Sequence, residues 1–202
     1  MAKKSKAKKN SNVSMIVSLI CLVLSVLMVV SFFIPTYTYG DESANKVNGV
    51  TLTQVAFMGE EDYEQAIEDS LSFVSKTEEE RAEASKLATV YEFANDEENA
   101  SFKVSIFMTW GLLIAGIAGI VFAVLALLSK SVNLGLLVST GVGMLFAILL
   151  VILASSAVNH ITESAGIFDG IVNIKTGVAV WFALVSSILA TGSAVAGKVL
   201  KK

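Results

Sequence analysis

Four long apolar stretches, separated by polar segments, dominate the pattern of the chain. Each is long enough to cross about 30 Å of hydrocarbon, which takes roughly 20 residues at helical rise. They span 13–34, 104–128, 134–158 and 177–199, and their only charged residue is Lys198, at the end of the fourth. This pattern predicts an all-α membrane protein, an antiparallel bundle of four transmembrane helices with a small extracytoplasmic α+β cap.

The polar segments carry opposite charges. All 18 acidic residues lie in 35–103 and 159–176, which have a net charge of −12, whereas the other polar segments hold eight lysines and no acid, and Lys198 adds a ninth lysine at the end of the fourth span. Because short cytoplasmic flanks retain lysine and arginine, both termini are expected in the cytoplasm of a plasma membrane. The predicted order is a basic cytoplasmic tail (1–12), the first span (13–34), an acidic extracytoplasmic domain (35–103), the second span (104–128), a cytoplasmic turn (129–133), the third span (134–158), an extracytoplasmic loop (159–176), the fourth span (177–199) and a cytoplasmic end (200–202).

The acidic domain contains three local signals. Residues 47–57 are rich in β-branched side chains, and Asn48-Gly49 at their beginning is a turn signal. This pattern predicts a short strand. Apolar residues recur at helical spacing between Glu61 and Ser75, which predicts an amphipathic helix. A second helix is expected to begin at Thr77, where Glu80 completes a capping box. Two short helices should therefore form a hairpin.

A further β signal lies in the second outer segment. Asp169-Gly170 stands between apolar pairs and favours a hairpin turn. We expect residues 172–174, or the hairpin itself, to pair with the strand near Leu52 and form a small sheet.

Small residues at spacing four indicate how the spans pack, because helices in lipid associate through close backbone approach. The second span has Gly111, Ala115 and Gly119. Similar series follow in the third and fourth spans: Gly135, Ser139 and Gly143, then Ala183, Ser187 and Thr191. Since a few residues around Lys130 join the second and third spans, these two should be antiparallel neighbours.

The flanks of the spans carry simpler signals. The lysine-rich tail has too little apolar content to fold and should be unstructured against anionic headgroups. Tyr37, Tyr39, Trp110 and Trp181 are expected at headgroup depth. Cys21 is the only cysteine, so no intramolecular disulfide can form.

No residue constellation predicts catalysis, a cofactor or a metal site. His160 is the only histidine and stands beside no nucleophile motif. The acidic runs 60–62, 78–80 and 96–98 lack the glycine-bearing spacing of a calcium loop and are read as solvated helix faces. Asn99-Ala100-Ser101 matches a glycosylation sequon, which matters only in a eukaryotic secretory pathway.

The order of four spans, with inner termini and a long first outer segment, is similar in topology to claudin-like tetraspan proteins. The likeness stops there, because residues 35–103 contain neither the tryptophan nor the paired cysteines of true claudins. Tetraspanins also differ, since their cysteine-rich segment lies between the last two spans. No family is assigned, and the cysteine-poor, lysine-started chain is more typical of a bacterial protein.

The sequence favours a non-enzymatic interaction protein. Its acidic outer domain is expected to act as a scaffold or accessory subunit that binds another membrane or envelope protein, or a second copy, with no role for nucleic acid. Five residues mark the expected surface or core of the outer hairpin: Tyr63, Ile67, Leu71, Leu87 and Tyr91. The alternative is a small channel or the membrane subunit of a transport complex, although spans without acidic residues, histidine or proline argue against coupled transport.

Overall fold

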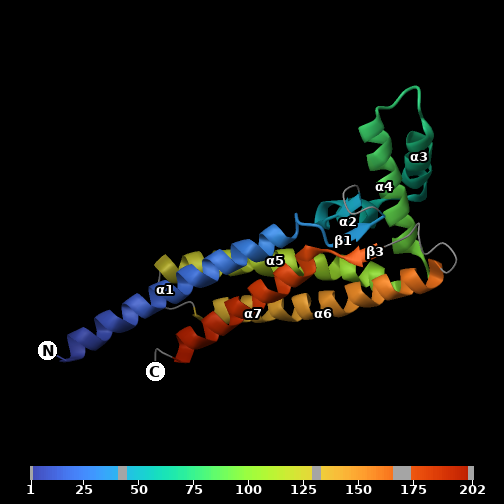
Figure 1. The fold of residues 1–202 in the computed structure, drawn as a ribbon. Helices are drawn as coiled ribbons and strands as arrows, with labels where there is room; N and C mark the ends of the chain where they lie inside the picture. The colour runs from blue at the N-terminus through green and yellow to red at the C-terminus, as the bar shows by residue number, and fades with distance from the viewer. Residues whose placement is uncertain (1, 41–44, 129–132, 166–173, 200–202) are drawn as a thin grey trace. The chain divides into compact units, whose positions relative to one another are not determined.

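The computed structural model describes residues 2–40, 45–128, 133–165 and 174–199, and most of them are helical (Figure 1). In chain order the elements are α1 (Ala2–Ser31), β1 (Tyr37–Tyr39), β2 (Asn45–Val47), α2 (Gly49–Phe57), α3 (Glu60–Leu71), α4 (Glu78–Asn95), α5 (Ala100–Leu128), α6 (Asn133–Ala165), β3 (Ile174–Thr176) and α7 (Val178–Val199). They form two compact units, one of residues 1–32, 108–151 and 179–202 and the other of residues 33–107 and 152–178.

Within the described residues, four helices are long and apolar enough to cross a membrane: Val13–Ser31, Ala100–Leu128, Leu134–Glu163 and Val178–Val199. The greater part of each lies in the first unit. Consecutive helices run in opposite directions (Figure 1), as the sequence predicts. Helices α5 and α6 are longer than the spans 104–128 and 134–158, because their polar ends continue as helix into the second unit. The expectation of an unstructured tail is wrong, since α1 already begins at Ala2; lysine and alanine are good helix formers and extend the apolar helix.

Side chains in the first unit are distributed as expected for a protein surrounded by lipid. On α1, Ser18, Cys21 and Ser25 are buried at spacings of three and four, whereas Leu19 and Val23 are more than half exposed. A protein folded in water would hide the large apolar residues instead. Small and weakly polar residues at the helix contacts are typical of bundles in hydrocarbon.

Helices α5 and α6 pack as neighbours, as predicted, and small residues of the two helices meet: a Cβ atom added to Gly143 would lie 3.4 Å from the Ala115 Cβ, and one added to Gly119 would lie 3.8 Å from the Ser139 Oγ. Two other glycines face phenylalanine rings. A Cβ atom added to Gly111 would lie 2.8 Å from the ring of Phe146 on α6, and one added to Gly135 would lie 2.6 Å from the ring of Phe122 on α5. Each glycine therefore makes room for a phenylalanine. The two helices therefore contact each other both through small residues and through rings that pack against glycines.

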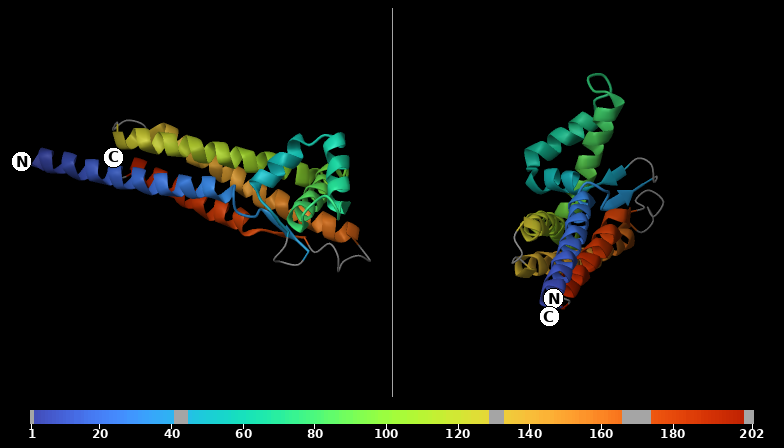
Figure 2. Two further views of the ribbon diagram at one scale, coloured as in Figure 1. Left: turned by 90° about the horizontal axis from the view of Figure 1, so that it is seen from above. Right: turned by 90° about the vertical axis from the view of Figure 1, so that its left-hand side faces the viewer.

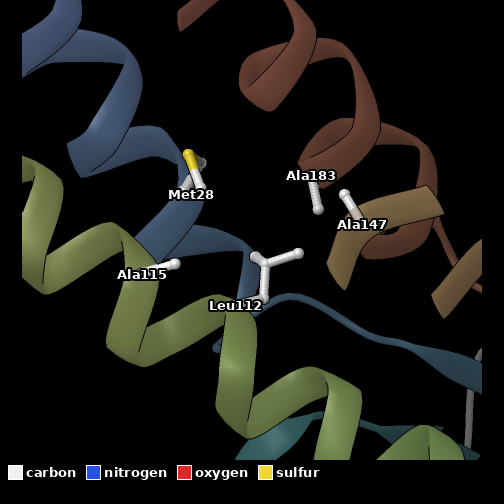
Figure 3. Packing of buried hydrophobic residues seen from close by; sticks show 5 residues of the cluster. All are labelled: Met28, Leu112, Ala115, Ala147 and Ala183. Atoms are coloured by element: carbon white, nitrogen blue, oxygen red, sulfur yellow. The ribbon is translucent and has the colours of Figure 1, made fainter. Parts of the chain in front are cut away.

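The centre of the first unit is filled by Met28 of α1 (Figure 3). The same buried cluster contains Leu112 and Ala115 of α5, Ala147 of α6 and Ala183 of α7. A side chain at Gly143 would collide with the Met28 Cε methyl group. One methionine thus brings all four helices together, which suits its long, unbranched side chain.

The second unit is built on a three-stranded antiparallel sheet of order β2-β1-β3. Tyr37 of β1 pairs with Val47 of β2 and with Thr176 of β3. The predicted pairing of 172–174 with a strand near Leu52 is wrong: the strand is Ile174–Thr176, and its partner is β1. The predicted turn at Asp169-Gly170 lies outside the described residues.

The predicted strand at 47–57 is also wrong, because Gly49–Phe57 forms helix α2. Asn48 is the N-cap residue, and its Oδ1 atom accepts hydrogen bonds from the backbone N–H groups of Val50 and Thr51 at 3.0 and 3.1 Å. Burial of Leu52 and Val55 on one face offsets the low helix propensity of the β-branched residues. Asn-Gly here starts a helix and does not turn a hairpin.

Candidate interaction surface

Helices α3 and α4 lie side by side and form the predicted hairpin, coloured teal to green in Figure 2. Their contact is narrow and uses Ala66 and Ala88, both nearly fully buried. The rings of Tyr63 and Tyr91 stack with centroids 4.6 Å apart at an interplanar angle of 19°. Tyr63 also donates a 2.8 Å hydrogen bond to the Glu92 carboxylate, which raises the pKa of Tyr63. Two alanines and one tyrosine pair therefore join the helices.

The start of α4 confirms the predicted capping box. Thr77 is the N-cap residue, and its Oγ1 atom accepts a 3.3 Å hydrogen bond from the backbone N–H of Glu80. The Glu80 carboxylate accepts bonds of 2.8 and 2.9 Å from the Thr77 backbone N–H and hydroxyl. These bonds, the backbone one first, lower the pKa of Glu80.

The hairpin is strongly acidic. Residues 59–99 contain fourteen Asp or Glu and three Lys or Arg, a net charge of −11. Each of the three bases is engaged within the hairpin: Lys76 pairs with Asp69 at 3.0 Å, Lys86 pairs with Glu83, and the Arg81 guanidinium lies over the ring of Phe73. The hydrogen bond from Lys76, followed by one from Gln65, lowers the pKa of Asp69. The surface that remains for a partner is therefore anionic.

Aromatic contacts hold the C-terminal end of α4 against the sheet. Phe93 meets Tyr39 edge to face, with centroids 6.2 Å apart, and Phe102 at 6.0 Å. Tyr37 stacks on Phe102 at 4.8 Å, and its hydroxyl is 2.6 Å from Ser105 Oγ. Tyr37 is fully buried, because the sheet turns its ring into the core of the second unit. Its place at headgroup depth stays a prediction. Burial raises the pKa of Tyr39 to about 12, although a hydrogen bond with Thr89 partly lowers this pKa.

The five marked residues of the hairpin divide into two groups. Tyr63, Tyr91 and Leu87 are partly buried between the helices, whereas Ile67 and Leu71 are exposed. Two further exposed apolar residues, Phe73 and Val74, lie outside the helix, because α3 ends at Leu71 and not at Ser75. Ser72 explains the early end, since its hydroxyl bonds to the Glu68 carbonyl oxygen in competition with the helix. Phe73-Val74 between two serines is the signal that could have identified an apolar turn.

The remaining polar candidates do not assemble into a reactive centre. His160 Nε2 lies 3.7 Å from Asp96 Oδ2 at the C-cap of α4. Asn99 of the sequon is buried, and its Oδ1 atom accepts a bond from the Phe102 N–H. Among the described residues, no group of three or more His, Cys, Asp or Glu side chains is placed to hold a metal ion.

A small apolar recess lies beneath α4. It has a volume of about 90 Å³, well below the roughly 300–1,000 Å³ of ordinary small-molecule sites. Its lining comes from α2, the end of α4 and the start of α5: Val55, Ala56, Met58, Ala94, Asn95, Lys103, Ile106 and Phe107. This recess is therefore too small for an ordinary small-molecule ligand.

No protein-family model, curated protein or solved structure is similar enough to this chain to match it.

Proposed function

We propose that this chain is a non-enzymatic protein of the plasma membrane, plausibly bacterial, whose acidic hairpin binds another envelope protein. The protein then serves as a scaffold or accessory subunit, held in the bilayer by its four apolar helices. The hairpin carries the proposal: it has a net charge of −11, and each of its bases is already engaged within it. A surface of this kind attracts a cationic partner over long range.

The distribution of charge supports an outward-facing hairpin. Every acidic residue lies in 35–103 or 159–176, and eight lysines lie in the other polar segments, with Lys198 at the end of the fourth span. With the positive-inside rule, both termini face the cytoplasm and the hairpin faces outward. The exposed leucines, valines and isoleucines of α1, α5, α6 and α7 support insertion in a bilayer.

A small channel, or a membrane subunit of a transport complex, is the second candidate. Two hydroxyls that are buried in the helical unit without a hydrogen-bond partner, those of Ser25 and Thr191, favour it, because they offer contacts to water or a polar solute. Met28 and Leu112 fill the centre of the same unit and oppose a path through a single copy. If the channel candidate holds, liposomes containing the protein pass solutes, and Ser25→Ala with Thr191→Val changes the rate.

A charge-neutralised variant tests the interaction proposal. This variant replaces five exposed glutamates together by Gln: Glu61, Glu64, Glu68, Glu78 and Glu79. The capping Glu80 and the paired Asp69 are kept. The control carries Ser75→Ala and Ser85→Ala, also at exposed positions. Chemical crosslinking in native membranes should give a defined adduct with the wild type and the control, and at least tenfold less with the neutralised variant. Equal adducts from all three proteins contradict the proposal.

A further inference from the structure

The turn between α3 and α4, residues 71–76, presents apolar side chains that the fold leaves uncovered. Leu71, Phe73 and Val74 are 65%, 73% and 102% exposed. Apolar side chains gathered at the end of a protruding element mark interaction sites more often than scattered ones do. We name this group the hairpin tip.

We infer that the hairpin tip inserts into an apolar recess on a partner protein, and that lysine and arginine residues surround this recess. The inference rests on the proposed function and specifies its contact point and the chemistry of the partner. An apolar centre with a charged rim is the usual arrangement of a protein interface, in which a few central side chains supply most of the affinity.

The tip is held in shape before any partner arrives. Ser72 donates its hydroxyl proton to the Glu68 carbonyl oxygen at 3.0 Å, and the Lys76 N–H bonds back to the Ser72 carbonyl oxygen at 3.3 Å. The Lys76 side chain pairs with Asp69, and the Arg81 guanidinium lies 4.3 Å from the Phe73 ring centroid. These contacts orient the turn, and Phe73 stays largely exposed although Arg81 lies over one face of its ring. Because the turn is ordered already, little conformational entropy is lost on binding.

The rim of the tip decides the charge of the partner. Glu68 near the end of α3, and Glu78 and Glu79 at the start of α4, flank the tip in the sequence and are exposed. Carboxylates at the edge of an interface favour lysine or arginine on the other side and repel like charge. Anionic headgroups and a second acidic hairpin both meet this repulsion, so a cationic protein surface is the occupant that fits.

The test begins in the native membranes of the cell. A photoreactive benzophenone amino acid replaces Phe73 in the full-length protein, and in the control it replaces Ser85, which is exposed on α4. Illumination should link position 73 to one distinct protein and position 85 to much less of it. An adduct with lipid, an adduct with a second copy, equal adducts at both positions or no adduct overturns the inference.

Binding of the captured protein, once purified, then tests the chemistry. The full-length chain in nanodiscs should bind it at least tenfold more weakly after Phe73→Ser, and also after Val74→Ser, whose side chain is fully exposed. Raising the salt from about 50 to 500 mM should weaken wild-type binding at least tenfold. Binding that is indifferent to salt, or to both substitutions, contradicts the inference.

The neutralised variant separates the two proposals. If it abolishes binding while Phe73→Ser and Val74→Ser leave binding unchanged, the acidic hairpin is the interaction surface and the tip is not its contact point. If the five glutamates and the tip can all be changed without effect, both proposals fail.

Discussion

Gly177 lies directly against the backbone of Pro35, so closely that a Cβ atom on the glycine would overlap the Pro35 carbonyl oxygen. The Gly177 N–H donates a 2.7 Å hydrogen bond to the Thr36 carbonyl oxygen. This contact joins the segment before β1 to the segment between β3 and α7. Backbone atoms cannot rotate aside as a side chain can, so only glycine fits here.

Gly177→Ala should therefore destabilise the protein by about 1–3 kcal/mol, the usual cost of overpacking. Gly192→Ala is the matched control, because no atom lies within 4 Å of its added Cβ. Thermal unfolding in detergent, followed by circular dichroism, measures both. Equal midpoints for the two variants would show that this backbone contact is not tight.

Packing between α5 and α6 gives a second prediction. Gly135→Ala pushes the Phe122 ring, whereas Gly141→Ala on the same helix meets open space. We expect a lower unfolding midpoint for Gly135→Ala alone, since the ring must leave its position against the glycine. Adding Phe122→Leu should return part of the loss, because the two sites are in contact and their effects are not additive. Strict additivity in this double-mutant cycle argues against the ring-on-glycine contact.

The capping box predicts a dependence on pH. The pKa of Glu80 is lowered in the folded hairpin, so the stabilisation from this carboxylate is present above the unfolded value near 4.3 and is lost as pH falls through the folded value. The N-terminal turn of α4 should fray in this acid range. Glu80→Gln should remove this acid dependence and keep α4 at neutral pH, because glutamine also completes a capping box. Acid titration followed by far-ultraviolet circular dichroism compares the two proteins, and identical acid curves contradict the assignment.

The buried hydroxyl pair of Tyr37 and Ser105 can be tested by truncating the Tyr37 side chain. Tyr37→Phe removes a hydroxyl from the core and should cost about 0.5–1.5 kcal/mol, the net value of one hydrogen bond. Tyr37→Ala also removes the ring that stacks on Phe102 and should cost about 3–5 kcal/mol. Limited proteolysis of the second unit, with thermal unfolding, measures both losses. If Tyr37→Ala leaves the unfolding midpoint and the rate of proteolysis unchanged, Tyr37 is not a core residue.

The proposed orientation can be read by labelling single cysteines. Cys21→Ala removes the only natural thiol, after which Ser75→Cys and Ala7→Cys are made separately. An impermeant maleimide should label position 75 in intact cells and position 7 only after permeabilisation. The reverse pattern would place the hairpin in the cytoplasm.

The sequence by itself determined the features that depend on local chemistry. Four apolar stretches predicted the four long helices, since length and composition suffice for that inference. Thr77 and Glu80 predicted the start of α4, because both capping partners lie within one turn. The hairpin followed from these signals and from the helical spacing of Tyr63 and Ala66.

Only the tertiary structure decided the features in which distant groups compete with local preference. Asn48-Gly49 has the pattern of a turn, yet burial of Leu52 and Val55 makes it the start of a helix. Tyr37 has the pattern of an interfacial residue, yet pairing with β2 and β3 turns its ring onto Phe102. Val74 continues the helical spacing of Ile67 and Leu71, but α3 ends at Leu71 and leaves the Val74 side chain fully exposed. In the first two cases the free energy of long-range packing outweighs a local propensity of about 1 kcal/mol or less. In the third, the helix ends before the residue.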